Sequence, residues 1–173
     1  MKNLIKALSF AAIVGFFATA CNSDPCKDVV CGTEGDCVEG ICECRLGYEE
    51  DTAGLCNIKM NSKFVGSFQA AEACDTSTYN YTLPITANSS ATKFNIADLY
   101  LTGTLMICDI TTSDPATPTN VGKKFTIPSQ TISTGLTCSG EGIINAATRV
   151  ITVSYTINDG TSSQSCSAVL SPL

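Results

Sequence analysis

Residues 149–157 of this 173-residue chain run Arg-Val-Ile-Thr-Val-Ser-Tyr-Thr-Ile, and this stretch decides the fold class. From residue 151 onward, large apolar residues alternate with Thr and Ser. An alternation with period 2 places one set of side chains on each face of a strand, so it predicts a half-buried antiparallel strand. The expected inward set is Ile151, Val153, Tyr155 and Ile157. Asn158-Asp159-Gly160 follows and predicts a hairpin turn, because Gly permits positive φ.

The same alternation recurs through the second part of the chain. Residues 79–87, Tyr-Asn-Tyr-Thr-Leu-Pro-Ile-Thr-Ala, alternate without a break. Six further stretches are strand candidates, namely 63–70, 93–101, 104–111, 123–132, 136–144 and 164–170. Eight short strands with regular turn signals predict an all-β domain, either a barrel or a sandwich. Pro84 and Pro128 would need bulges in a closed barrel but could lie on edge strands of a sandwich. We expect the antiparallel barrel, with the β-sandwich as the alternative.

Composition changes sharply near Cys56. Residues 21–56 contain seven cysteines and nine acidic residues against Lys27 and Arg45, a net charge of −7. Residues 57–173 contain four cysteines, have a net charge of −1, and include 34 Ser and Thr among 117 residues. This change predicts two domains. Only the second is long enough for an ordinary hydrophobic core, so the first must be held by disulfides.

The first domain has a specific cysteine spacing, Cys26-x4-Cys31-x5-Cys37-x4-Cys42-x-Cys44-x11-Cys56. The stretch from Cys42 to Tyr48, Cys-Glu-Cys-Arg-Leu-Gly-Tyr, followed by seven residues and Cys56, fits the ending of an EGF-like module. The chain over 26–56 therefore resembles that family. The resemblance implies the bridges Cys26–Cys37, Cys31–Cys42 and Cys44–Cys56. Cysteine spacing alone would allow fifteen pairings.

The second domain, 63–173 after a linker at 57–62, weakly resembles a lipocalin-like barrel. It opens on Lys63-Phe64-Val65-Gly66-Ser67-Phe68, a glycine and aromatic pattern like that of the family's first strand. Phe68 stands where the family has Trp, and the family's Arg on the last strand is missing. Cys74 and Cys166 follow the first strand and begin the last, so we expect a bridge between them. Cys108 and Cys138 are then expected to form the other bridge.

The N-terminus carries a targeting signal. Residues 1–6 include Lys2 and Lys6, residues 7–17 are apolar, and Ala18-Thr19-Ala20 precedes Cys21. These features predict a signal peptide over 1–20. The Ala18–Cys21 stretch resembles the lipobox of bacterial lipoproteins, which implies a lipid on Cys21, an anchor segment at 21–25 and the outer membrane of a Gram-negative cell. The odd number of cysteines supports this, because a lipid on Cys21 leaves ten of the eleven, an even number that can all pair. Ordinary cleavage after Ala20 and secretion is the alternative.

Several function classes are disfavoured by composition. The chain has no His, so it lacks an imidazole base and His-ligated metals, and we expect neither an enzyme nor a cofactor. The net charge of −6 disfavours nucleic acid as a partner. The cysteines do not have zinc-knuckle spacing, the Asn22-Ser23-Asp24-Pro25 lead-in does not match the D-x-D-E of calcium-binding EGF-like modules, and Val38–Ile41 is too short for their pattern, so no metal is expected.

The remaining candidate residues belong to the second domain. Asp98 interrupts the alternation of residues 94–100 and is either a buried carboxylate or, as we expect, a strand end. Glu141 lies between two glycines and is expected in a loop. Four tyrosines could line a pocket or simply fill the core, namely Tyr79, Tyr81, Tyr100 and Tyr155.

Two functions fit these expectations. The first is a membrane-anchored binding or interaction lipoprotein that presents its Thr/Ser-rich faces and the 112–122 loop to a surface protein or glycan. The second is a lipocalin-like carrier of a small apolar ligand. The interior separates the two, because a cavity of about 300 Å³ or more would favour a carrier and a filled core would favour interaction.

Overall fold

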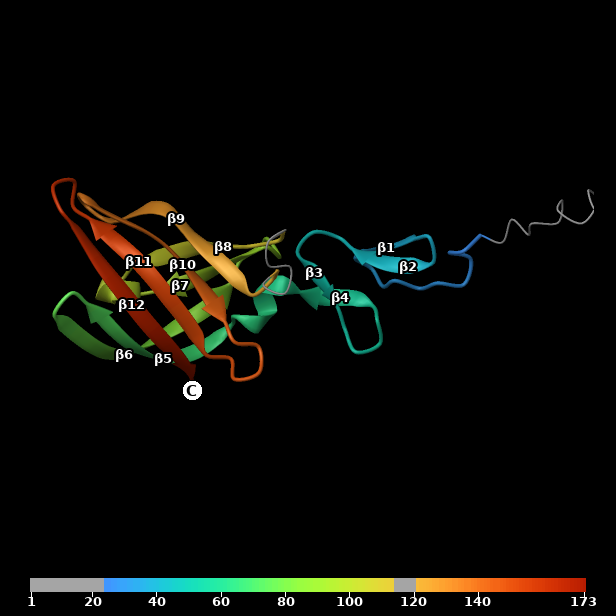
Figure 1. Cartoon of the computed structure of the whole chain (residues 1–173), viewed down its shortest axis with the longest axis horizontal. Helices are drawn as coiled ribbons and strands as arrows, with labels where there is room; N and C mark the ends of the chain where they lie inside the picture. Colours follow the sequence, from blue (N-terminus) through green and yellow to red (C-terminus); the bar gives the residue numbers. More distant parts are fainter. Residues whose placement is uncertain (1–23, 114–120) are drawn as a thin grey trace, which may run out of the picture.

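The computed structural model describes residues 24–113 and 121–173. Two parts lie in line, a disulfide-rich module followed by a β-barrel (Figure 1). The signal peptide and Cys21 fall outside the described residues, as does most of the predicted 112–122 loop. Across the described stretches, none of the helices has the length and apolar character needed to span a membrane.

The module consists of two short hairpins. Its four strands are β1 (Gly35–Val38), β2 (Ile41–Cys44), β3 (Tyr48–Glu50) and β4 (Cys56–Lys59), paired β1–β2 and β3–β4. Three bridges cross it, Cys26–Cys37, Cys31–Cys42 and Cys44–Cys56, which is the pairing that the resemblance implies. Cys31 and Cys56 are the buried hydrophobic residues of this part, so the bridges take the place of a core.

The barrel is closed and antiparallel. Its strands are β5 (Gly66–Cys74), β6 (Ser77–Ala87), β7 (Lys93–Ala97), β8 (Leu105–Ile110), β9 (Lys124–Ser133), β10 (Leu136–Ile144), β11 (Ile151–Asn158) and β12 (Ser163–Pro172). Each strand pairs with the next, and β12 pairs with β5 to close the ring. The all-β prediction is confirmed, as is the choice of a barrel over a sandwich. Two 3-10 turns, η1 (Met60–Lys63) and η2 (Leu99–Leu101), precede β5 and follow β7.

Alternation accounts for the core. On β11 the buried residues are every second one, from Ile151 to Ile157, and the Thr and Ser residues between them face outward. Pro128 lies beside a shift in register between β9 and β10, so its missing N–H falls at a bulge as a closed barrel requires. Pro84 lies where β6 has not yet begun to pair with β7, a pairing that starts at Ile85.

The barrel end next to the module, here called the proximal end, is sealed by aromatic rings. Phe64, which follows η1, stacks on Phe94 with ring centroids 4.3 Å apart, and both rings meet Phe125 edge-on. All three are almost completely buried. Gly142 pairs with Phe125 across β9 and β10, and a Cβ at Gly142 would lie 2.3 Å from the Phe125 ring. The missing side chain therefore leaves room for the phenylalanine.

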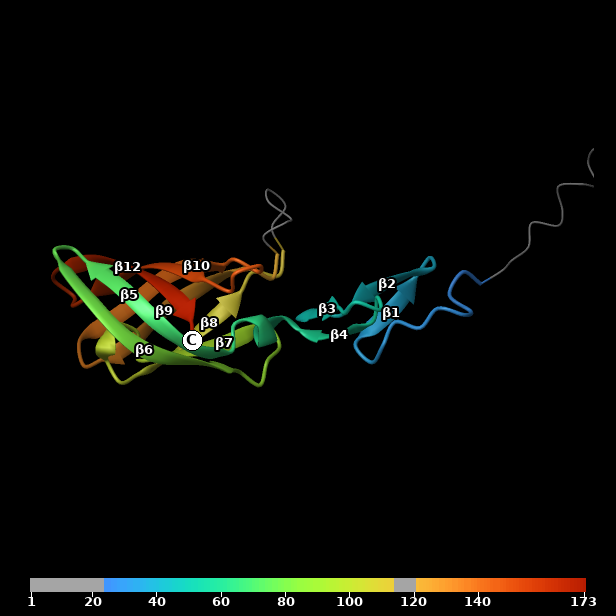
Figure 2. The same cartoon turned by 90° about the horizontal axis from the view of Figure 1, so that it is seen from below.

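The module is joined to the proximal end by specific contacts. The Asn61 side-chain nitrogen lies within hydrogen-bond distance of the carbonyl oxygens of Asn88, Ser90 and Lys93, which holds the β6–β7 loop against η1. Lys63 Nζ lies 2.6 Å from Glu49 Oε1 of β3. A view from below shows the module extending from this end of the barrel (Figure 2).

Candidate functional site

The opposite end of the barrel, here called the distal end, contains a buried carboxylate. Glu72 lies on β5, where the alternation places it inward with Phe68, Ala70 and Cys74, and only 3% of it is exposed. It is the one buried charged residue in the described part of the chain. Burying an isolated carboxylate is costly, so its surroundings determine what it can do.

Two phenol groups and a disulfide surround Glu72. The Tyr81 hydroxyl, on the neighbouring strand β6, donates a hydrogen bond to Glu72 Oε2. Sγ of Cys74, which is bridged to Cys166, lies 3.3 Å from Glu72 Oε1 and 3.9 Å from the Tyr155 hydroxyl. This bridge joins β5 to β12, which are paired neighbours, as expected from the sequence.

The tyrosine hydroxyls act as donors here. Burial, and next the hydrogen bond with Glu72, raise the pKa of Tyr81 above its usual range. The same two causes, in the same order, raise the pKa of Tyr155. Both phenols therefore stay protonated at neutral pH and can hydrogen-bond a carboxylate, but neither can serve as a general base.

A short strained loop crosses this end of the barrel. The strand predicted over 93–101 stops at Ala97, because the next residue, Asp98, has a φ of 63°. Tyr100 and Leu101 also have left-handed φ values, of 60° and 53°. Each such residue costs on the order of 1–3 kcal/mol, so the surrounding contacts must hold the loop. Asp98 supplies one of them, since its Oδ1 accepts the Gly103 N–H at 2.6 Å.

Tyr100 is fixed across the barrel mouth by two hydrogen bonds. Its backbone N–H donates to the Tyr81 hydroxyl at 3.1 Å, and its own hydroxyl donates to Gln164 Oε1 of β12 at 2.8 Å. The Tyr81 hydroxyl thus links the loop backbone to the buried carboxylate of Glu72. The position of Tyr100 and the environment of Glu72 are therefore coupled.

Two small cavities lie on either side of Tyr100. One, of about 200 Å³, is lined by Glu72, Tyr79, Tyr100 and Leu101. The other, of about 170 Å³, is lined by Tyr100, Leu136, Ile157, Asp159, Ser162 and Gln164. Since a water occupies about 30 Å³ of the liquid, the first cavity has room for a small organic group or about six waters.

The expected bridge between Cys108 and Cys138 is not formed, and both residues are free and buried. Cys108 lies on β8 and Cys138 on β10, with β9 between them. Strands two apart in a sheet are separated by about 9–10 Å, beyond the Cα separation of about 7 Å that a disulfide tolerates. Burial raises the pKa of the Cys138 thiol to about 11 and that of Cys108 further still. Neither thiol is a ready nucleophile or metal ligand at neutral pH.

Glu72, Cys74 and Cys166 bring three potential metal-binding atoms close together. Two of these atoms are the sulfurs of one disulfide, so they are not thiolates. Within the described residues this group therefore offers a metal a single carboxylate, which is too few ligands for a structural site.

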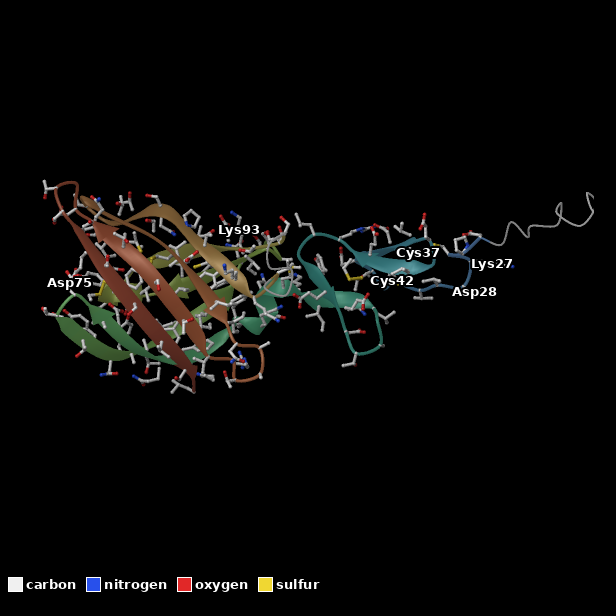
Figure 3. The ribbon with its side chains drawn as sticks, viewed as in Figure 1. Lys27, Asp28, Cys37, Cys42, Asp75 and Lys93 are labelled. Carbon is white, nitrogen blue, oxygen red and sulfur yellow. A yellow bond between two sulfur atoms is a disulfide. The ribbon has the colours of Figure 1, made fainter. Side chains whose placement is uncertain are left out.

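The other residues that the sequence singled out do not all lie in this site. Tyr81, Tyr100 and Tyr155 come together around Glu72, whereas Tyr79 lies at the edge of the cavity and is 40% exposed. Glu141 is not in a loop as expected, but faces outward from β10. It borders an open groove of about 670 Å³ on the outer face of the distal barrel, whose lining includes five small hydroxyl residues (Ser139, Ser154, Thr156, Ser165 and Ser167). Asp75, labelled in Figure 3, lies at the distal tip of the same groove.

Sequence reasoning missed Glu72, although the signal was present. The first strand was expected to end at Ala70, and the structure continues it to Cys74. One more step of the alternation from Phe68 and Ala70 places Glu72 on the inward face. No protein-family model and no curated protein matches this chain.

Proposed function

We propose that this chain is a lipid-anchored lipoprotein of the cell envelope, in the outer membrane of a Gram-negative cell, that acts as a binding module. One observation carries the proposal. The two cavities beside Tyr100 and the hydroxyl-lined groove lie at the end of the barrel remote from the module, in addition to an open groove of about 760 Å³ beside the β10–β11 turn at the proximal end. Residues 24–28 lie at the outer end of the module (Figures 1 and 3). A lipid on Cys21 would thus hold the chain at one end and present the binding end away from the membrane.

The module suits the role of a spacer. Its three bridges support its interpretation as an EGF-like module, and a disulfide-held segment with little core keeps its shape without much bulk. Met60 N–H donates to the Gly47 carbonyl at 2.8 Å, and Asn61 N–H to that of Ala91 at 3.2 Å. Together with the Glu49–Lys63 ion pair, these contacts favour a fixed orientation between module and barrel.

The barrel interior favours a binding module over a carrier of apolar ligands. Its buried residues include four phenylalanines and twelve Leu, Ile and Val residues, so most of the interior is filled by side chains. The cavity of about 200 Å³ beside Glu72 is smaller than the 300 Å³ or more of a typical ligand pocket, and its wall carries a carboxylate. A surface protein or glycan that contacts the distal end is the partner class that this geometry supports.

The proposal is tested by following the full-length chain and its Cys21→Ser variant in a Gram-negative host. Membranes are separated from the soluble fraction, intact cells are treated with protease, and the remaining peptides are identified by mass spectrometry. We expect the natural chain in the outer membrane with a lipid-modified Cys21, and loss of barrel peptides after protease treatment. The Cys21→Ser chain should leave the membrane fraction.

Two results would contradict the proposal in different ways. An unmodified Cys21 in a soluble chain would remove the anchor. A lipid-modified chain that resists protease until the outer membrane is opened would keep the anchor but exclude a partner outside the cell.

A further inference from the structure

Glu72 is a buried charge without a positive partner. The described part of the chain contains four ion pairs, Arg45–Glu34, Arg45–Asp36, Lys63–Glu49 and Lys93–Asp109, and none of them involves Glu72. The hydrogen bond that it accepts comes from the neutral Tyr81 phenol, so the described residues supply no positive charge next to this carboxyl group. A buried carboxylate is costly unless it is hydrogen-bonded, paired with a cation or protonated, so a cationic ligand would supply a partner that the described residues do not provide.

The cavity beside Glu72 has the walls that an organic cation prefers. Two of its four lining residues, Tyr79 and Tyr100, are aromatic, and a third, Leu101, is aliphatic. The face of a tyrosine ring attracts a cation within about 6 Å of its centre, and methylated ammonium groups are recognised in this way. The carboxylate at the inner wall supplies the opposite charge.

The cavity can be reached from outside. Tyr79 and Leu101 are 40% and 54% exposed, whereas Glu72 at the inner wall is 3% exposed. Polarity therefore changes with depth, from a half-exposed rim of aromatic and apolar groups to a buried carboxylate. A ligand that enters with its charged group first would match this order.

We propose that the cavity formed by Glu72, Tyr79, Tyr100 and Leu101 is a binding site for a small organic ammonium ion. The charged nitrogen lies against the Glu72 carboxylate, its methyl or methylene groups contact the two rings, and the rest of the ligand points past Leu101 to solvent. The inference deepens the proposed binding function and rests on it. A hard metal ion fits less well, because calcium requires six to eight oxygen ligands and the wall offers one carboxylate.

Choline is the probe for this site, and 3,3-dimethylbutan-1-ol is its control because it has the same shape without the charge. Both are titrated into the purified full-length chain in detergent, and binding is followed by calorimetry and by the NMR signals of the tyrosine rings. Ionic strength is held constant with sodium chloride, so that general screening does not mimic binding. We expect saturable binding of choline and at least tenfold weaker binding of the neutral alcohol.

Three variants locate the site. Glu72→Gln keeps the shape of the side chain and removes its charge, and should weaken choline binding at least tenfold. Glu43→Gln removes an exposed charge from β2 of the module, away from the barrel, and should leave the affinity unchanged. Tyr79→Ala, at a half-exposed position that tolerates truncation, should weaken binding about two- to fivefold, as expected for one exposed cation–π contact. Tyr79→Phe, which keeps the ring, should restore the affinity.

The inference is overturned if the natural chain shows no saturable choline binding, if the neutral alcohol binds equally well, or if Glu72→Gln binds choline like the natural chain. Should Glu72→Gln fail to fold, the Tyr79 pair decides, and equal affinities of Tyr79→Ala and Tyr79→Phe would count against the site. These results are independent of the lipid on Cys21. A lipid-modified, surface-exposed chain that ignores choline loses only the ligand assignment, whereas a soluble chain that binds choline loses only the anchor.

Discussion

The proximal end of the barrel is sealed by three phenylalanine rings, whereas the distal end holds a carboxylate, two phenols and two small cavities. At the proximal end the rings pack against one another, and the missing side chain of Gly142 makes room for Phe125. At the distal end the chain accepts a buried carboxyl group and four left-handed residues that are not glycine (Asp75, Asp98, Tyr100 and Leu101), against one, Arg149, at the proximal end. One end of the barrel therefore stabilises the fold, and the other departs from the most stable arrangement.

Such a division of roles within one barrel has a physical basis. Strain and buried polar groups persist only where the rest of the structure compensates for their cost. The aromatic seal, the closed ring of eight strands and the Cys74–Cys166 bridge provide that compensation. The distal end thus departs most from the arrangement that stability favours, and it is there that we propose the binding site.

Phe64→Ala should produce the largest effect, and it addresses the proximal end. The substitution removes a fully buried ring from the stack with Phe94, so we expect the free energy of unfolding to fall by about 3–5 kcal/mol, measured by urea denaturation. The neighbouring Val65, which is 36% exposed, provides the control Val65→Ala with a much smaller change. Choline binding at the distal end should not change in the fraction that remains folded. A parallel loss of binding would mean that the two ends are not independent.

Tyr81→Phe should have an intermediate effect, and it addresses the distal end. The substitution keeps the ring but removes the hydroxyl that donates to Glu72 and accepts from the Tyr100 N–H. A buried group left without its partner costs about 1–3 kcal/mol, so the chain should lose stability by that amount in the same denaturation experiment. Tyr79→Phe is the matched control, because no hydrogen bond involves its hydroxyl within the described structure. Equal stability of the two variants would show that water replaces the Tyr81 hydroxyl.

The strands were predictable from the sequence because their signal is local. All eight appear near their expected positions, since period-2 alternation such as that of 151–157 depends only on neighbouring residues. The strand expected over 93–101 failed after Ala97 because hydrogen bonds within the 98–104 loop stabilise left-handed residues, which propensity disfavours. The inward position of Glu72 follows from the same pattern, but a charged residue in an apolar alternation invites an early end to the strand.

Other features depend on contacts that the sequence does not encode locally. The bridge expected between Cys108 and Cys138 fails because β9 separates their strands, and only the strand order reveals this. The meeting of Tyr81, Tyr100 and Glu72 depends likewise on the register of β5 with β6 and on how the 98–104 loop folds back. Residue type made these tyrosines candidates, and the closed barrel brings them together.

The smallest expected effect concerns Asp159, in the exposed β11–β12 turn at the distal end. Its carboxylate accepts the backbone N–H groups of Ser162 and Thr161 at 2.6 and 2.8 Å and both of their hydroxyls at 2.8 Å. These bonds, the Ser162 N–H foremost, hold the pKa of Asp159 well below its usual range. A carboxyl with a lowered folded-state pKa stabilises the fold above its unfolded pKa of about 3.9, and this contribution is lost as the pH falls through the folded value.

A pH series therefore tests the turn. We expect Asp159→Asn to melt slightly below the natural chain at neutral pH, and this difference to shrink as the pH falls below about 3.9, since protonation removes the charge from the natural chain as well. Asp75→Asn changes an exposed acid in the β5–β6 turn, where no side-chain hydrogen bond holds the carboxylate within the described structure, and should match the natural chain throughout. NMR titration of the Asp159 carboxyl measures the cause directly, and an ordinary pKa near 3.9 would mean that the distal turn is not held by this carboxylate. A lowered pKa would show that even the exposed rim of the distal end is ordered by its own polar contacts, whereas the proximal end combines polar contacts, at Asn61 and Lys63, with its aromatic seal.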